Sequence, residues 1–325
     1  MSETPAPPNN VPRRKLLQIG IAGLGIGIAS AAAWAAGRRE PDGEVLYNDT
    51  AWRRTDPALI RYREVERIPT GLQRPRALAI AHDGTLYIAG DRCVVSIAPE
   101  GKRRSEVACA DAPRSLAITT DGTVLVGLRD RVQPISRDTA GPTWEALAVD
   151  AQITGLAAHP SGDVYAADAG GRALWRFRDG KALNRIGGEG DHEFIIPSPY
   201  MDVQIGPDGL VWVANTGRHR LEAYDQQDHR VRMWGAEGFA IERFCGCCNP
   251  ADFSVLPDGR FITSEKGLPR VKRYAADGRF ECVVAAVETF APQTVGLDIA
   301  VAADGRVLIL DPIEKAVRIY VEKNA

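Results

Sequence analysis

Three of the six cysteines in this chain lie within four positions, in the segment F-C-G-C-C-N-P at residues 244–250. Thiolates this close together suit a soft metal ion, such as copper(I) or zinc, or part of an iron–sulfur cluster. Cys245, Cys247 and Cys248 are therefore candidate metal ligands or redox thiols. No fourth ligand is visible in the sequence. Two disulfides compete with this hypothesis, one between Cys247 and Cys248 and one from this segment to Cys282.

Four basic residues are candidates for binding an anion. Arg76 and Arg114 each follow a proline by one residue, at the start of a short apolar run. Lys266 lies in the segment S-E-K-G-L-P-R and His219 in N-T-G-R-H-R, each between two apolar runs. Two guanidinium groups at one opening suit an anionic ligand or an acidic partner. Simple solvated charges are the alternative.

The elements that position these residues come from a repeat. Six times, a short apolar run ends in a tight glycine turn, a second apolar run follows, and a polar loop leads to a third. The turn glycines are Gly84, Gly122, Gly162, Gly209, Gly259 and Gly305. A glycine turn between alternating apolar residues is a strong hairpin signal. A period of roughly 40 to 50 residues built from short strands predicts a β-propeller rather than a β-sandwich.

The repeat resembles that of the NHL family, P-x-G-[IL]-A-V-D-x-x-G-x-[VI]-Y-V-A-D-x-x-N-x-R-[IV]. The match covers about residues 64–322 and is best over 201–224. The C-G-C-C-N-P segment, with T-S-E-K-G-L-P-R-V-K shortly after it, is similar to a bacterial subgroup of NHL-like proteins. The resemblance implies an all-β fold, a six-bladed NHL-like propeller over residues 64–325.

The pattern also predicts how the ring closes. The last repeat supplies three strands, and the segment Glu64–Ile68 alternates without belonging to any repeat. We expect it to pair with Val317–Val321 as the fourth strand of the sixth blade, because closure removes the exposed sheet edges.

A propeller of this kind has two unlike faces. The six glycine turns and the other short turns belong to one face. The loops that lead into the inner strands, and those between second and third strands, belong to the other, which we call the top face. The basic candidates and the Cys-rich segment all fall on the top face, so we expect function there.

Cys93 and Cys109 are predicted to lie on the third and fourth strands of the first blade, around a turn centred near residue 101. Directly opposed residues on neighbouring strands stand at a separation that a disulfide bridges. We therefore predict a structural disulfide, with a reduced buried pair as the alternative.

The first 63 residues are expected to include an export signal or a membrane anchor. Residues 1–12 are polar and proline-rich, which predicts disorder. Arg13 and Arg14 precede an uncharged apolar stretch, so residues 13–37 resemble a twin-arginine export signal or a transmembrane anchor, followed by a linker at 38–63. Either reading predicts a periplasmic protein, anchored to the inner membrane if the signal is not cleaved.

Composition and motifs narrow the function. The net charge of −2 and the scattered Lys and Arg argue against nucleic-acid binding. Related propellers include peptidyl-hydroxyglycine lyases, which have zinc-bound channel histidines, and calcium lactonases, which have a central acid and amide set. No histidine falls in an inner strand here, and we see no channel-lining acids at matching positions of the repeats. A Ser/His/Asp triad, a P-loop and a nucleotide fingerprint are also missing from the sequence.

We therefore expect an exported, membrane-tethered propeller that acts as a binding or assembly module through its Cys-rich top-face loop, rather than an enzyme. Its expected partner is a protein or a small anionic ligand at the top face. The alternative is a metal- or redox-dependent periplasmic protein that uses Cys245, Cys247 and Cys248, with a soft metal or an iron–sulfur cluster as cofactor.

Overall fold

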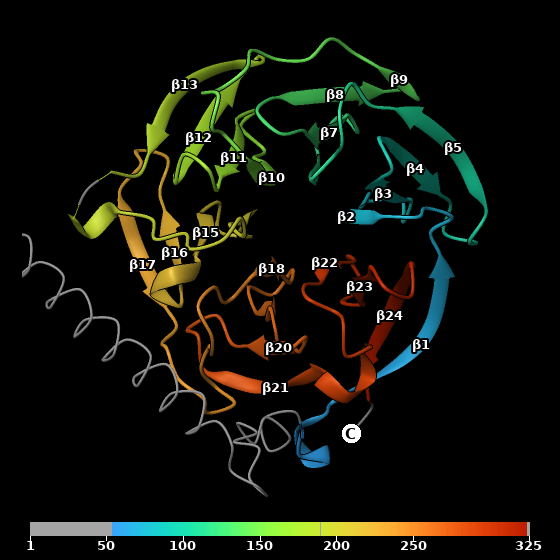
Figure 1. Cartoon of the computed structure of the whole chain (residues 1–325), viewed down its shortest axis with the longest axis vertical. Helices are drawn as coiled ribbons and strands as arrows, with labels where there is room; N and C mark the ends of the chain where they lie inside the picture. Colours follow the sequence, from blue (N-terminus) through green and yellow to red (C-terminus); the bar gives the residue numbers. More distant parts are fainter. Residues whose placement is uncertain (1–53, 189, 324–325) are drawn as a thin grey trace, which may run out of the picture. The chain divides into compact units, whose positions relative to one another are not determined.

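The structure is a computed structural model that describes residues 54–188 and 190–323. The described strands form six four-stranded antiparallel sheets arranged as blades around a centre (Figure 1). Blade 1 holds β2 (Pro75–Ile80), β3 (Leu86–Gly90), β4 (Cys93–Ile97) and β5 (Arg103–Ala108). Blade 2 holds β6 (Ser115–Ile118), β7 (Val124–Gly127), β8 (Val132–Ser136) and β9 (Thr139–Ala140). Blade 3 holds β10 (Ile153–Ala158), β11 (Val164–Asp168), β12 (Ala173–Arg178) and β13 (Lys181–Ile186).

The other three blades repeat this plan. Blade 4 holds β14 (Val203–Ile205), β15 (Val211–Asn215), β16 (Arg220–Tyr224) and β17 (Arg230–Trp234). Blade 5 holds β18 (Asp252–Val255), β19 (Phe261–Ser264), β20 (Val271–Tyr274) and β21 (Phe280–Ala285). Blade 6 holds β22 (Asp298–Val301), β23 (Val307–Asp311), β24 (Ala316–Glu322) and β1 (Tyr62–Pro69). The predicted six-bladed β-propeller is therefore confirmed.

Glycine turns join the first two strands of each blade. All six turn glycines have φ between 77° and 90°, a left-handed conformation that other residues adopt only with strain. In the first of these turns, the amide of Gly84 donates to the carbonyl of Ala81 at 2.9 Å. The repeated glycine signal thus has a direct conformational cause.

The ring closes as predicted. β1 pairs antiparallel with β24, and the register sets Ile68 opposite Val317 and Glu64 opposite Tyr320. Figure 1 shows the two strands side by side, although they come from opposite ends of the described chain. β1 is longer than the predicted Glu64–Ile68, because it begins at Tyr62 and continues to Pro69.

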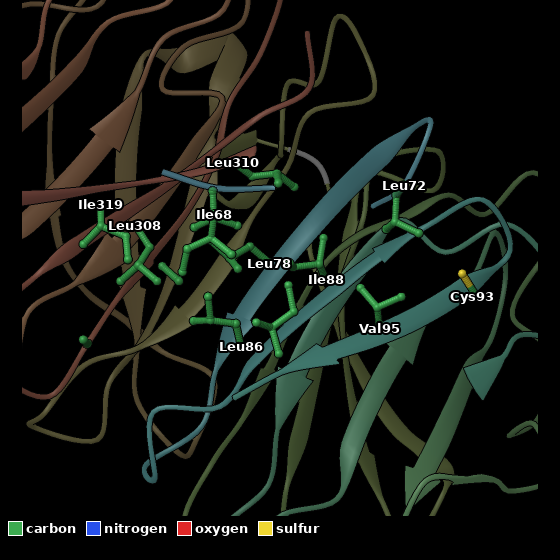
Figure 2. Close-up of a cluster of buried hydrophobic side chains, with 14 residues drawn as sticks. Ile68, Leu72, Leu78, Leu86, Ile88, Cys93, Val95, Leu308, Leu310 and Ile319 are labelled. Atoms are coloured by element: carbon green, nitrogen blue, oxygen red, sulfur yellow. The ribbon is translucent and has the colours of Figure 1, made fainter. Parts of the chain in front are cut away.

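The core lies between neighbouring blades. Figure 2 shows one such cluster, where Leu308 and Ile319 of blade 6 pack with Ile68 of β1 and with Leu86 and Ile88 of blade 1. Similar clusters of buried aliphatic and aromatic side chains fill the spaces between other pairs of blades. This packing holds the loops of the top face on a rigid support.

The predicted pairing of Cys93 with Cys109 is wrong in register. Cys93 stands opposite Ala108, and a β-bulge lies beside Ser96 on the same pair of strands. A shift of one residue turns a side chain to the other face of the sheet. Cys93 accordingly packs in the cluster between blades 6 and 1 (Figure 2), whereas Cys109 packs in the cluster shared with blade 2. Both are free, buried thiols in this structure.

Most of the N-terminal predictions lie outside the described residues. These include the disordered stretch 1–12, the signal or anchor 13–37 and the linker 38–63 as far as residue 53. The end of that linker packs on the propeller: the amide of Thr55 donates to Oε1 of Glu288 at 2.7 Å, and that of Arg61 to the carbonyl of Val283 at 3.1 Å.

Helix is confined to short 3₁₀ turns in the described part of the chain. They are η1 (Pro57–Leu59), η2 (Gly190–His192), η3 (Thr216–Arg218) and η4 (Val287–Thr289). Across residues 54–188 and 190–323, none of the helical segments has the length and apolar character needed to cross a membrane.

Candidate functional site

A pocket of about 410 Å³ opens on the top face, among the residues that lead into the inner strands. Its lining comes from every blade, including Arg76 of β2, Thr154 of β10, Asp252 of β18 and Asp298 of β22. The loop after β23, around Pro312, completes one wall. The face that the sequence predicted to carry function therefore holds a recessed site.

The structure brings Arg76 and Arg114 together in this pocket, as predicted. Arg76 is exposed and Arg114 is half-buried. Among the residues that the structure describes, neither guanidinium has a carboxylate or other side-chain partner. Burial lowers the pKa of Arg114, and the positive charges of Arg76 and Arg129 lower it further. The pocket thus carries two guanidinium groups that form no direct ion pair with a described carboxylate, although the charge of Asp111 acts on Arg114.

Two carboxyl groups that were not predicted as site residues, Asp252 and Asp298, line the same pocket. Oδ1 of Asp252 accepts a hydrogen bond from the amide of Ile299 at 3.0 Å, and Oδ2 of Asp298 accepts one from the amide of Leu78 at 2.7 Å. Each carboxyl therefore ties its own inner strand to the inner strand of the next blade.

Asp202 holds the equivalent position in blade 4, where its Oδ2 accepts from the amide of Phe253 at 3.3 Å. The expectation that no channel-lining acids occur at matching positions is therefore wrong. The signal was present, because three of the six repeats place an aspartate directly before the first residues of the apolar run. It is easily missed, since the other three repeats have Ala77, Ser115 and Gly155 there.

The environment of these acids favours their protonated forms. Burial, and then the charge of Asp202, raises the pKa of Asp298 to about 8. Burial likewise raises the pKa of Asp202 to about 7. The pKa of Asp252 is raised well above its usual range, first by burial and then by repulsion from Asp298 and Asp202. Because both carboxyl groups are buried and repulsion between them raises the pKa of Asp252, this environment favours a protonated carboxyl group, which can donate a hydrogen bond as well as accept one.

The three cysteines of the 244–250 segment do not converge on one point. Cys245 is buried, and its Sγ lies 3.9 Å from Oε1 of Glu265. Cys247 is exposed, whereas Cys248 is buried and lies beside Ser198. Within residues 54–188 and 190–323, no group of three or more His, Cys, Asp and Glu side chains is arranged to hold a metal ion. The described residues therefore do not assemble the three-cysteine ligand set that the sequence left open as one alternative.

Cys245 belongs instead to a buried ion network. Oε2 of Glu265 pairs with Arg270 at 2.7 Å and with Nζ of Lys272 at 3.4 Å. Lys272 also donates to the carbonyl of Arg243 at 2.8 Å. Burial, followed by repulsion from Glu265, raises the pKa of the Cys245 thiol. Cys245 thus lies on the buried side of the loop, against the Glu265 network of blade 5.

Cys248 has contacts that suit a thiolate. Ser198 Oγ donates to its Sγ at 2.9 Å, Nζ of Lys266 lies at 3.6 Å, and Sγ of Cys247 lies at 3.0 Å. Burial alone would raise the pKa of the Cys248 thiol, but the hydrogen bonds from Cys247 and Ser198 and the charge of Lys266 lower it overall. Lys266 also lies over the ring of Tyr200, which lines the pocket, with 5.0 Å to the ring centroid.

One buried asparagine holds the two loops of this cluster together. Nδ2 of Asn249 donates to the carbonyl of Cys245 at 2.6 Å, and its Oδ1 accepts from the amide of Lys266 at 2.6 Å. The side chain of Asn249 therefore links the top-face loop that contains Cys248 to the loop that contains Lys266.

His219 does not join the other candidates. It is buried, has φ of 53° at the end of η3, and is not among the residues that line the top-face pocket. Its Nδ1 has no hydrogen-bond partner in the described part of the chain. The left-handed turn directs the chain from β15 into β16 and leaves this side chain inside the blade rather than at the pocket.

Comparisons with known proteins support the fold. No protein-family model matches the chain, and no curated protein sequence matches it significantly. Among solved structures, a streptogramin B lyase aligns with a TM-score of 0.58 at 10% identity, over 82% of this chain and 100% of that one. Virginiamycin B lyase from Staphylococcus aureus aligns with a TM-score of 0.55 at 11% identity, over 81% and 100%.

A Bacteroides thetaiotaomicron protein of unknown function aligns with a TM-score of 0.57 at 13% identity, over 81% of this chain and 72% of that one. This protein is therefore a six-bladed β-propeller. Its structural neighbours include virginiamycin B lyases, and at these identities the likeness shows the fold alone. The resemblance to the NHL family stays a prediction.

Proposed function

We propose that this protein is a binding module whose top-face pocket takes a small anionic ligand. The observation that carries the proposal is the pair Arg76 and Arg114, which line one pocket and form no direct ion pair with a carboxylate in the described part of the chain. Guanidinium groups bind carboxylate and phosphate oxygens in two-point contacts, and each charge-assisted hydrogen bond contributes about 1.5–3 kcal/mol. A pocket of about 410 Å³ suits a small molecule better than a protein surface.

The two carboxyl groups in the pocket restrict the kind of anion that fits it. Asp252 and Asp298 lie in the same pocket as the arginines, and together they can accept and donate hydrogen bonds. A ligand that uses both features carries a carboxylate or phosphate and, separately, a hydroxyl or amino group. Small hydroxy acids and phosphorylated alcohols have this combination.

The proposal includes export of the propeller from the cytoplasm. The paired arginines at Arg13 and Arg14 and the apolar stretch after them support delivery of the propeller to the periplasm, tethered to the inner membrane if the signal is retained. The top face would then meet ligands outside the cytoplasm.

The test is ligand-induced thermal stabilisation followed by calorimetry. Wild-type protein is screened against phosphate, citrate, malate and glycerol phosphate at low salt, and the screen is repeated with Arg76→Ala/Arg114→Ala. At least one anion should stabilise the wild type, and the double variant should bind it at least tenfold more weakly. Arg306→Ala is the matched control, because Arg306 pairs with Asp304 beside a glycine turn of the opposite face. Equal binding by the double variant and the wild type would contradict the proposal.

A further inference from the structure

We propose that Cys247 and Cys248 form a thiol–disulfide exchange site on the top face, which switches between a dithiol and a disulfide. The two sulfur atoms lie 3.0 Å apart, one exposed and one buried. Neither lines the anion pocket described above, so the two proposals concern different groups, although Lys266 beside Cys248 also lies over Tyr200 of that pocket.

The two thiols have different surroundings, and the difference assigns their roles. Cys247 is open to solvent, so a reacting disulfide reaches its sulfur first. Cys248 is only 1% exposed and is held by Ser198 and Lys266, which stabilise its sulfur as a thiolate. Cys247 is therefore the attacking residue, and Cys248 is first its base and then the resolving thiol.

The exchange balances with a disulfide of the class R–S–S–R as oxidant. Cys247 passes its proton to the Cys248 thiolate across their contact, and the new Cys247 thiolate attacks one sulfur of the oxidant. The S–S bond of the oxidant breaks, a mixed disulfide forms on Cys247, and one RS⁻ leaves. That RS⁻ takes the proton from Cys248, whose sulfur then attacks Cys247 and releases the second RS⁻. The two cysteine sulfurs lose two electrons, and the oxidant gains them.

Geometry makes this disulfide reversible. The Cα atoms of adjacent residues are about 3.8 Å apart across a trans peptide, below the roughly 4.4–6.8 Å that disulfides prefer. A strained disulfide is easily reduced, and the contacts of Lys266 and Ser198 further favour the reduced state by stabilising the Cys248 thiolate. A permanent structural bond at this position is therefore disfavoured.

The experiment uses glutathione as the probe. The full chain is equilibrated in buffers with a graded ratio of oxidised to reduced glutathione, quenched with acid, alkylated and mapped by peptide mass. The expected result is the paired loss of the thiols at 247 and 248, without bound glutathione, and its full reversal by reduced glutathione. The buried thiols Cys93, Cys109 and Cys282 should remain alkylatable only after denaturation.

Two variants test the assigned roles. Cys247→Ala changes an exposed residue, and it should abolish oxidation of Cys248. Lys266→Met removes the cation beside Cys248. The ratio of oxidised to reduced glutathione at which half of the disulfide has formed should therefore fall about tenfold. Lys181→Met, on an exposed outer strand far along the chain in blade 3, is the matched control and should leave the midpoint unchanged.

The proposal is overturned if Cys247 and Cys248 stay reduced in every buffer, or if the wild type stops at a glutathione adduct on Cys247. A midpoint that Lys266→Met does not move would overturn the role given to Lys266. None of these readouts depends on anion binding, so failure of one proposal leaves the other standing.

Discussion

Nη2 of Arg318 on β24 lies 2.6 Å from Oε2 of Glu64 on β1, and the two residues are 254 positions apart in the chain. Arg318 is buried, and its Nη1 lies 3.3 Å from a carboxylate oxygen of the fully buried Asp311. This ion pair spans the strand pairing that closes the ring. Closure therefore combines a hydrogen-bonded register, apolar packing and a buried charge network.

Removing β1 should prevent the propeller from folding to a soluble state. A chain that begins at Thr70 lacks β1, so it exposes the edge of β24 and loses Ile68 from the core. A chain that begins at Arg54 keeps β1 and should remain folded and soluble. Size-exclusion chromatography and circular-dichroism melting compare the two. Similar elution and melting of both chains would show that β1 is dispensable.

Arg318→Met should lower the free energy of unfolding by about 3 kcal/mol, because it leaves Asp311 buried without its cationic partner. Arg306→Met is the matched control, since Arg306 forms a solvent-exposed pair with Asp304 and should change stability by no more than about 0.5 kcal/mol. Urea denaturation measures both. Equal effects of the two substitutions would mean that the buried network adds little to closure.

Asp298→Asn should flatten the pH dependence of stability. The folded state raises the pKa of Asp298 to about 8, whereas the unfolded value is about 4, so the folded protein binds more protons in this window. The free energy of unfolding of the wild type should therefore fall as pH rises from about 4 to about 8.

Asparagine stays neutral and still accepts from Leu78, so Asp298→Asn should exceed the wild type in stability at pH 8 by on the order of 1 kcal/mol. Part of the pH dependence of stability should remain in this variant, because the folded state also raises the pKa of Asp202 and Asp252. Urea denaturation at pH 5, 6.5 and 8 gives the comparison, with the exposed Asp304→Asn as control. Parallel curves for Asp298→Asn and the wild type would argue against a protonated pair.

Arg13→Lys/Arg14→Lys should stop export through the twin-arginine route, because that route reads the arginine pair. Cell fractionation should then find the propeller in the cytoplasm. A change of Arg38 and Arg39 to Lys, after the apolar stretch, is the control and should leave export intact. Undiminished periplasmic protein with the first double variant would point to the general secretory route instead.

Most of the fold could be predicted from local patterns in the sequence. Each glycine turn with its flanking apolar runs specifies one hairpin, and six copies specify six blades. Closure by β1 was also predictable, because a β-strand without a partner leaves an unpaired edge. The meeting of Arg76 and Arg114 followed from their equivalent places in two repeats, since equivalent places in a propeller surround one axis.

Other features depended on contacts that no local pattern records. A one-residue difference in register separated Cys93 from Cys109. The thiol of Cys248 meets Ser198 and Lys266, which stand 50 and 18 positions away, only because three top-face loops pack together. The acid pair formed because Asp252 and Asp298 begin the inner strands of adjacent blades around a narrow centre. Residue types and turns are fixed locally, whereas the side of a strand and the neighbour of a loop depend on the whole ring.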